Sequence, residues 1–506
     1  MKKTIALFLL VFGFCGMMPE ASAQGRGLSA MFGYSTFYLP EDNMPYVETY
    51  LNFDAWTLAF AKDETGQYRA TVEVVLAVRR NDTIAYLKKY DLNSPNVSDP
   101  KQNGFTFLDL QRFSLPNGLY DMELTLRDKV ANGQPYVYKE KLIVYYQKDK
   151  PALSMLQMMT SVVPTDRPGQ LSRGGYDMTP CVSDYYPATI STLYPYVEIY
   201  NLDKELRGAG FVVRYYVEKK ESGVRVEGME RLHRYAKSEH ETALIGALDI
   251  TNLASGNYNL VLEVCDNNGD VMLKSQVSFY RSNPMVQSDG ALADVLTSFA
   301  GLIKDEKKLD YYISALYPIS SGEEIVAAEH VKATGDLSAK QTYLYEFWLR
   351  RSELDPAGKW NEYLTWLTYV DEHYSYPLTP GYRTDRGRVY LQYGPPDFVR
   401  DEKNFVGALR VAPSTNGQVQ ISGEDHMSRG HIYYLPYQLW RYNRLETDEP
   451  NRVFLFWDEM RSGFYKLLNS NARGEVRDPY WERRLSQGHL EENVVGEVGE
   501  QFDRGY

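Results

Sequence analysis

Residues 115–128 read LPNGLYDMELTLRD, and residues 253–266 read LASGNYNLVLEVCD. In both stretches Leu-x-x-Gly-x-Tyr leads into apolar residues at every second position, and Gly, Tyr and Asp recur at a constant offset of 138. The glycine gives a turn its backbone freedom, and the alternation is typical of a half-buried strand. We therefore expect the rings of Tyr120 and Tyr258 to enter a core while each hydroxyl bonds back to upstream backbone.

Two further features of the sequence indicate how the chain is divided into domains. Pro45-Tyr-Val-Glu48 returns as Pro195-Tyr-Val-Glu198 at an offset of 150, and offsets near 140 are the length of a domain rather than of a solenoid repeat. About seven strand-like runs fill each half, as in immunoglobulin-like sandwiches, whose tyrosine corner the motif resembles. The sequence predicts two tandem immunoglobulin-like β-sandwiches, at 24–150 and 151–283.

Helical periodicity replaces the alternation after Asn283-Pro284. Apolar residues recur at helix spacing from 295 to 302, and Ser338-Ala-Lys-Gln341 reads as a capping box. Asp355-Pro356 is a typical start for a long helix that follows. We predict a helical segment at 284–376.

Strand-like runs return in the last quarter, which we predict to be an α+β domain at 377–485 followed by a polar tail at 486–506. The runs lie at 388–393, 431–442, 453–457 and 464–468. The chain as a whole is therefore predicted to be multidomain and mainly β.

Composition limits the classes of partner. The 506 residues are 43% hydrophobic, which fits a globular chain, and carry 55 basic against 67 acidic side chains, a net charge of −12. An acidic chain without a Lys/Arg block is a poor candidate for nucleic-acid binding. The 42 tyrosines suit half-wet β surfaces, because each ring has an apolar body and a polar tip.

The N-terminus has the features of a signal peptide at 1–23. Two lysines precede a short apolar stretch, and Ala21-Ser-Ala23 is a cleavage site, so we expect a mature chain from Gln24. The alternative is a lipoprotein anchored on Cys15. No later apolar stretch is long enough to span a membrane. Cleavage leaves Cys181 and Cys265, which form one disulfide or stay as two free thiols.

Motifs of known chemistry are absent from the sequence. It has no H-E-x-x-H, P-loop, Rossmann glycine fingerprint or G-x-S-x-G elbow, and no two carboxylates are convincingly paired for glycoside hydrolysis. Glu424-Asp-His426 is the densest ligand-like cluster, and a solvated loop explains it better than a metal site. We therefore expect no catalytic residues, no metal and no cofactor.

One segment is specified beyond a generic core: residues 381–397 read GYRTDRGRVYLQYGPPD. Gly381, Thr384 and Asp385 match a Gly-Trp-x-Thr-Asp motif, and Tyr382 stands in the place of its Trp. With the Trp-rich helix before it and the aromatic strands after it, this segment resembles the GWxTD domain of exported proteins of Gram-negative bacteria. The resemblance implies a periplasmic or outer-membrane-associated location and carries no established reaction. Tyr382 keeps an aromatic ring in the place of the Trp, so the replacement puts in doubt only roles that need the indole N–H.

The motif could be a polar ligand site or a structured turn in which Thr384 and Asp385 accept backbone bonds. It contains no His, Cys, Ser, Lys or Glu, and its only carboxylates are Asp385 and Asp397. If 385–392 is extended, its seven steps alone cover about 23 Å, beyond the roughly 5–9.5 Å of paired acid/base work. We therefore interpret the motif as a structural hub that shapes a partner-binding surface. The candidate residues are Gly381, Tyr382, Thr384, Asp385, Arg386, Gly387, Tyr393, Gly394, Pro395, Pro396, Asp397 and Trp440.

Three functions follow, in this order. The first is a non-catalytic scaffold of the cell envelope that docks a protein partner through its C-terminal domain. The second is a glycan- or peptidoglycan-binding module with aromatic platforms at Tyr433, Tyr434, Tyr437, Trp440 and Tyr442, of which about half should be core by strand alternation. A hydrolase is the third.

Overall fold

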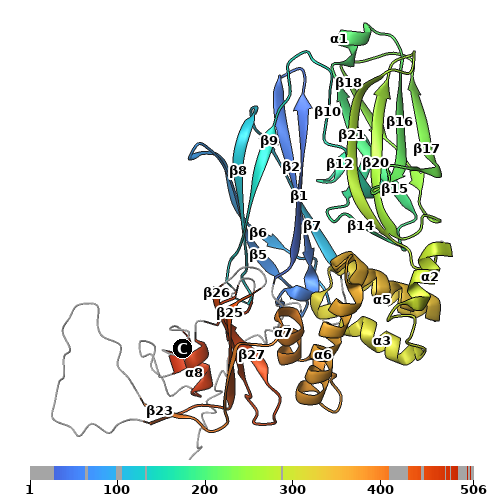
Figure 1. Ribbon diagram of the computed structural model, residues 1–506. Coiled ribbons are helices and arrows are strands. Elements are labelled where there is room, and N and C mark those ends of the chain that lie inside the picture. Colours follow the sequence, from blue (N-terminus) through green and yellow to red (C-terminus); the bar gives the residue numbers. More distant parts are fainter. Residues whose placement is uncertain are drawn as a thin grey trace, which may run out of the picture.

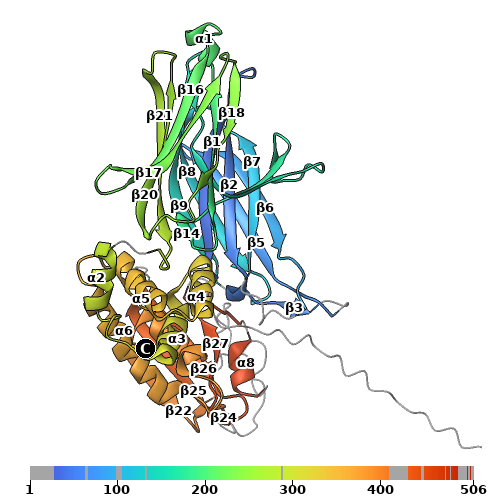
Figure 2. The same ribbon diagram turned by 90° about the vertical axis from the view of Figure 1, so that its right-hand side faces the viewer.

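The computed structural model describes residues 28–62, 66–98, 105–131, 134–286, 289–408, 431–445, 450–472, 475–478, 480–487, 498–499 and 502. The protein is mainly β, with antiparallel sheets in its upper part and in its C-terminal part (Figure 1). The helices that follow the second sandwich in the chain lie below the sandwiches, beside the C-terminal sheet (Figures 1 and 2). The predicted signal peptide and most of the polar tail lie outside the described residues.

The first sandwich packs a three-stranded sheet against a four-stranded one around a shared apolar core. The first sheet has the order β1 (Ala30–Leu39), β2 (Met44–Asp54), β7 (Thr106–Ser114). The second has the order β6 (Thr83–Asn93), β5 (Thr71–Arg80), β8 (Gly118–Asp128), β9 (Tyr136–Val144). A small pair, β3 (Ala61–Lys62) and β4 (Tyr68–Arg69), and a turn, η1 (Ala55–Thr57), lie at its side.

The second sandwich is built in the same way around its own core. One sheet has β15 (Thr192–Tyr200) at its centre, joined by β10 (Ala152–Leu153), β11 (Gln157–Pro164), β13 (Tyr176–Pro180), β12 (Ser172–Arg173), β18 (Glu241–Ile245) and β19 (Leu248–Asp249). The other has the order β14 (Tyr185–Pro187), β21 (Val271–Ser282), β20 (Gly256–Cys265), β16 (Phe211–Lys219), β17 (Arg225–Tyr235). A short helix, α1 (Leu202–Leu206), follows β15.

The repeated motif forms the predicted corner in both sandwiches. Tyr120 is buried and its hydroxyl donates to the carbonyl of Pro116 at 2.7 Å. Tyr258 is buried as well, and its hydroxyl donates to the carbonyl of Ala254 at 3.0 Å. The prediction for these two residues is confirmed, because both close the same four-residue loop.

The helices form a bundle beneath the sandwiches. Their bounds are α2 (Asp289–Thr297), α3 (Glu306–Ala315), η2 (Tyr317–Ile319), α4 (Gly322–Thr334), α5 (Leu337–Arg351) and α6 (Pro356–Tyr374). Asp355 caps α6, as expected from the Asp-Pro start, by accepting from Gly358 N at 2.8 Å. The predicted capping box of α5 is wrong: Asp336 is its cap, and the box lies on α4, between Ser321 and Glu324.

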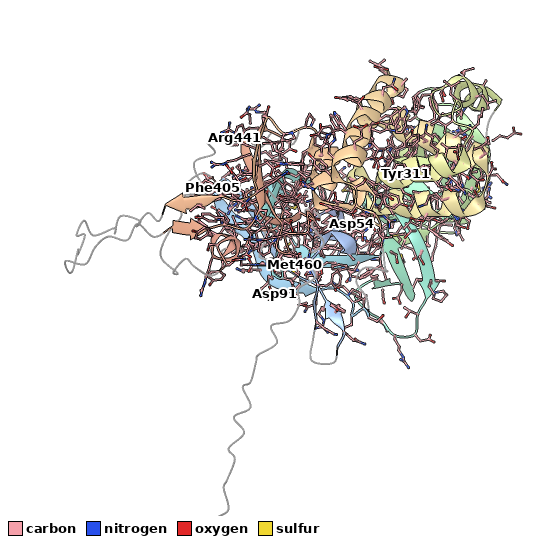
Figure 3. The ribbon with its side chains drawn as sticks, turned by 90° about the horizontal axis from the view of Figure 1, so that it is seen from below. Asp54, Asp91, Tyr311, Phe405, Arg441 and Met460 are labelled. Carbon is pink, nitrogen blue, oxygen red and sulfur yellow. The ribbon has the colours of Figure 1, made fainter. Side chains whose placement is uncertain are left out.

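The C-terminal sheet is covered on both faces. Its order is β22 (Phe398–Glu402), β25 (Tyr437–Arg444), β26 (Pro450–Trp457), β27 (Lys466–Ser470), and a separate pair is β23 (Val406–Ala408) with β24 (His431–Tyr433). One face packs on the helices in a common core, and the other packs on α8 (Trp481–Leu485). In the view from below, Tyr311 lies among the helices while Phe405 and Arg441 lie on the sheet side (Figure 3). The helices and this sheet thus share one core.

Candidate functional site

The motif at 381–397 is a turn and a helix, not the entry to a strand. Residues Gly381–Arg383 form η3 and Asp385–Tyr393 form α7, so the predicted strand at 388–393 is wrong. Thr384 is the helix cap: its hydroxyl accepts from Gly387 N at 3.1 Å and donates to the Gly381 carbonyl at 2.8 Å. A threonine before a polar first turn is a helix start, and that signal outweighs the alternation of Val389 and Leu391.

The helix changes the spacing of the motif carboxylates. Seven helical residues rise only about 10 Å. The separation of Asp385 and Asp397 along the chain therefore does not exclude paired acid/base chemistry. The contacts give a better account. A carboxylate oxygen of Asp385 accepts from Leu467 N of β27 at 2.7 Å, while exposed Asp397 accepts from Asn443 N at 2.7 Å. Each carboxylate fastens a different strand, and burial raises the pKa of Asp385.

Two glycines allow the turn to pack against α6. A Cβ on Gly387 would collide with the carbonyl oxygen of Gly381, and a Cβ on Gly381 would come within 2.5 Å of the Val370 carbonyl. Both positions therefore require glycine because of close backbone approach rather than φ. Tyr382 is buried and meets Tyr311 edge-on, with ring centroids 5.6 Å apart.

A buried ion pair joins α7 to the chain after β27. Arg388 donates to both carboxylate oxygens of Glu475 at 2.8 Å, and Tyr393 donates its hydroxyl to the same group at 3.0 Å. Glu475 has no exposed surface. Its role could not be predicted, because it lies 87 residues from Arg388 in a polar stretch without periodicity.

Arg386 connects the motif to the surface. Its guanidinium lies between the rings of Tyr374 and Tyr465, at 4.7 and 4.4 Å from their centroids, and donates to the hydroxyl of Tyr376 at 2.8 Å. That hydroxyl donates in turn to the carbonyl of Gly463 at 2.6 Å. The motif thus joins two exposed turns, 375–380 and 458–464, which we call the docking turns.

The docking turns carry exposed apolar side chains on a braced frame. Leu378 is 97% exposed and Met460, labelled in Figure 3, is 81% exposed. Asp458 fixes the second turn by accepting from Ser462 N at 2.9 Å and Gly463 N at 2.6 Å. Leu378 and Met460 are thus exposed apolar side chains on turns that are held by hydrogen bonds.

The other predicted site residues have structural positions. Gly394 ends α7 with a φ of 78°, and Tyr442 donates its hydroxyl to the Gly394 carbonyl at 2.9 Å. Pro395 is exposed and Pro396 is half-buried in the turn to β22. Trp440 is fully buried in the core shared with the helices, so it is no part of a surface site.

The predicted glycan platform is largely absent. Tyr434, Tyr437, Trp440 and Tyr442 are all buried, and only Tyr433, at 62%, is exposed. More rings than expected are core because both faces of the sheet are covered. The alternation also breaks between β24 and β25, so that Tyr434 and Tyr437 share one core.

The two thiols are free, so the candidate disulfide is not formed. The Cys181 thiol donates to the Ser183 carbonyl at 2.7 Å, and burial raises its pKa to about 12. Cys181 also interacts with Tyr186, whose ring packs on Phe279 opposite Tyr258 at the start of β20. Cys265 is at the other end of that strand, about 25 Å away by strand rise.

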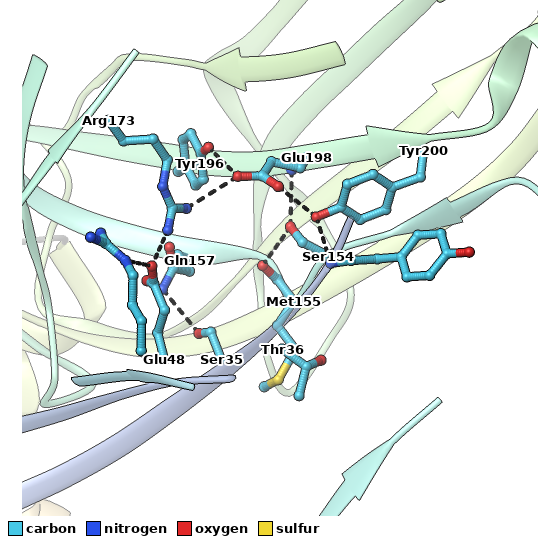
Figure 4. Close-up of polar contacts among 12 residues, drawn as sticks. Ser35, Thr36, Glu48, Ser154, Met155, Gln157, Arg173, Tyr196, Glu198 and Tyr200 are labelled. Atoms are coloured by element: carbon cyan, nitrogen blue, oxygen red, sulfur yellow. Dashed lines mark hydrogen bonds and ion pairs between the residues drawn. The ribbon is translucent and has the colours of Figure 1, made fainter. Parts of the chain in front are cut away.

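A second polar cluster, which we call the clasp, joins the two sandwiches (Figure 4). Arg173, on a hairpin of the second sandwich, binds Glu48 of the first and donates to Glu198 of the second at 3.2 Å. Its guanidinium lies over the rings of Phe37 and Tyr196, 4.4 and 4.9 Å from their centroids. Glu48 and Glu198 are the two glutamates of the repeated Pro-Tyr-Val-Glu, so the repeat marks the interface, although no spacing pointed to Arg173.

The described residues contain neither a candidate metal site nor a candidate membrane-spanning helix. Within the described residues no group of three His, Cys, Asp or Glu side chains could hold a metal ion, and Glu424-Asp-His426 lies outside them. None of the helices that the structure describes is long and apolar enough to cross a membrane.

Comparisons with known proteins show no family. No family model matches the chain, and no curated protein matches it. A glycosyl hydrolase family 2 member from Bacteroides cellulosilyticus DSM 14838 aligns at 11% identity and a TM-score of 0.16, over 46% of this chain and 28% of that one. The fibronectin(III)-like modules of Clostridium thermocellum CbhA align at 11% identity and a TM-score of 0.13, over 54% of this chain and 97% of theirs. Scores this low carry no argument about function.

Proposed function

We propose that the protein is a non-catalytic scaffold of the Gram-negative cell envelope that holds a protein partner on its docking turns. In this proposal, two immunoglobulin-like sandwiches form a spacer, and the GWxTD-like part with its helices presents the contact surface. The chain is exported through its signal peptide. The motif at 381–397 shapes the surface from below and does not itself touch the partner.

The relay from Arg386 through Tyr376 to Gly463 carries the proposal. It links a buried motif to two exposed turns by hydrogen bonds of 2.8 and 2.6 Å. A catalytic motif would keep polar groups free at a cleft. Here Thr384 caps a helix, Asp385 binds β27 and Arg388 is held by Glu475, so these groups are committed to the fold.

The test is capture of an envelope partner by tagged variants. Leu378→Asp places a charge on the first docking turn without touching a core, so it should abolish cross-linked capture while the melting temperature stays unchanged. Leu354→Asp is the matched control, because Leu354 is equally exposed at the other end of α6. A partner that is captured equally by both variants contradicts the proposed docking surface.

Tyr376→Phe tests the relay itself. It removes the hydroxyl that bonds Arg386 and Gly463, at a stability cost of about 1 kcal/mol. Capture should weaken although the fold persists. Unchanged capture would separate the docking turns from the motif and leave the motif a purely structural role.

A further inference from the structure

A carboxyl group lies in the contact between the helical bundle and the second sandwich. Helix α5 lies at the lower end of that sandwich (Figures 1 and 2). Its Glu346 hydrogen-bonds Ser255, in the turn before β20. One turn further along α5, the guanidinium of Arg350 lies over the rings of Tyr185 and Tyr280, 4.8 and 5.3 Å from their centroids. We call the contact formed by these five residues the junction.

The basic residues near the junction do not pair with Glu346. Arg350 forms an ion pair with Glu324 of α4. Arg281 of β21 donates through Nη1 to two backbone carbonyls of the sandwich, at 2.8 and 2.7 Å. The Oε2 atom of Glu346 is shielded from solvent and has no hydrogen-bond partner within the described residues. An ionised Glu346 would therefore be a buried charge without a counter-ion, which is unfavourable.

The phenol groups around Glu346 titrate in a different pH range. Tyr185, Tyr258 and Tyr280 interact electrostatically with its carboxyl from β14, β20 and β21. Burial raises the pKa of each phenol above its ordinary value of 10, to about 12 for Tyr185. Burial also raises the pKa of Glu346 to about 8. Among these four groups, Glu346 is thus the one that changes charge between pH 6 and pH 9.

Ser255 connects this carboxyl to the point where the chain leaves the sandwich. Its hydroxyl accepts from Asn283 N at 2.8 Å. The side chain of Asn283 donates in turn to the carbonyls of Thr251 and Leu253, at 2.9 and 3.0 Å. Asn283 directly follows β21 and begins the connection to the bundle. A change of charge at Glu346 therefore acts on the hydroxyl that holds the start of this connection.

We propose that the junction is a pH-sensitive contact, which is closed while Glu346 carries a proton and which releases α5 from the second sandwich when Glu346 ionises. The sandwich keeps its own core after release. The bundle stays attached to the first sandwich, where Glu323 of α4 accepts from the side chain of Asn52 at 3.0 Å. Release is therefore local, and it uncovers Tyr185 and Tyr280. The proposal is independent of the docking turns.

Hydrogen–deuterium exchange of the full chain at pH 6, 7, 8 and 9, read by mass spectrometry, tests the proposal. A peptide that includes the Asn283 amide reports on the junction, and peptides from β5 and β16 report on the two sandwich cores. A pKa of about 8 when closed and 4.5 when open raises the open fraction by up to about a hundredfold from pH 6 to pH 9. After correction for the intrinsic exchange rate, we expect at least about a tenfold rise at the junction and none in the cores.

Variants without a charge at position 346 show whether Glu346 causes the rise. Glu346→Gln keeps the shape of the side chain and should exchange at every pH as the parent does at pH 6. Glu346→Met is a second uncharged side chain of similar length and should behave in the same way. Glu353→Gln is the matched control, because Glu353 is exposed just beyond the end of α5, and it should keep the pH profile of the parent. Melting curves show that each variant is folded.

Three results would overturn the proposal. The first is a junction peptide of the parent that exchanges at the same corrected rate at pH 6 and pH 9, because Glu346 would then ionise without release. The second is a rise that the core peptides share, because the whole protein would then open. The third is a rise that persists in both Glu346→Gln and Glu346→Met, because another group would then control the junction.

Discussion

A single tyrosine hydroxyl closes the corner of each sandwich, and its ring fills the adjoining core. We expect Tyr258→Ala to lower the free energy of unfolding by roughly 3–5 kcal/mol, the range for large buried aromatics cut to alanine. Tyr258→Phe keeps the ring and loses only the bond to Ala254, so about 1 kcal/mol should be lost. Denaturant unfolding of both variants measures the difference. A melt of Tyr258→Ala within a degree or two of the parent would contradict the corner.

Glu346 on α5 is a residue whose charge opposes the fold. Its carboxylate hydrogen-bonds Ser255 of the second sandwich, and burial raises its pKa from 4.5 to about 8. One carboxylate oxygen has no hydrogen-bond partner within the described residues. The folded protein therefore holds a proton here that the unfolded chain releases above its ordinary pKa.

This proton makes stability depend on pH. The raised pKa of Glu346 contributes stability that is complete at low pH and is lost as pH rises from about 4.5 to about 8, at up to ~1.4 kcal/mol per pH unit. Glu346→Gln should flatten this part of the curve, and the exposed Glu353→Gln should leave it unchanged. Urea unfolding at pH 5, 6, 7 and 8 measures the slope. An identical slope in Glu346→Gln would assign it to other groups.

At the scale of an element, close packing of α7 against the backbone of the preceding turn constrains its sequence more than helix propensity does. Gly→Ala inside a helix ordinarily gains about 1 kcal/mol. Gly387→Ala should instead lose at least ~2 kcal/mol, because the new Cβ meets the Gly381 carbonyl. Thr365→Ala on the exposed face of α6 is the control and should change little. Thermal melts compare the two, and a stabilised Gly387→Ala would show that α7 does not pack this closely.

Sequence patterns predicted the elements that obey one local rule. The alternation after Gly118 and Gly256 predicted β8 and β20, and Asp355-Pro356 predicted the start of α6. The pattern misled where two rules met: residues 388–393 alternate like a strand but follow a helix cap at Thr384. Local alternation could not show that α6 lies against both glycines of the turn, because that contact belongs to tertiary packing.

The site shows the same limit. The motif residues were found from their resemblance to a family, and the structure shows several of them buried and bonded inside the fold. Glu475 lies 87 residues from its partner Arg388, and Gly463 lies 87 residues from its partner Tyr376, so no local pattern could pair them. Exposure of Leu378 and Met460 depends on which turns stay uncovered, which only the assembled molecule determines.

At the scale of the whole molecule, the clasp is a charged contact that joins the two sandwiches. Two glutamates from equivalent repeat positions face each other, and their like charges would repel without the guanidinium between them. Glu48 also binds Arg112, and Glu198 accepts the hydroxyls of Tyr196 at 2.6 Å and Tyr200 at 2.5 Å. Arg173 is thus the one group in the clasp that binds both carboxylates.

Arg173→Ala should therefore loosen the spacer without unfolding either sandwich. Removing one partner of a buried ion pair costs about 3–5 kcal/mol, and here that cost falls on the interface, because each sandwich keeps its own core. Small-angle scattering should show a larger radius of gyration for Arg173→Ala. Arg214→Ala is the control, because Arg214 pairs with Glu263 inside one sheet of the second sandwich. If Arg173→Ala scatters as the parent does, the apolar contacts around Phe37 hold the angle and the clasp does not.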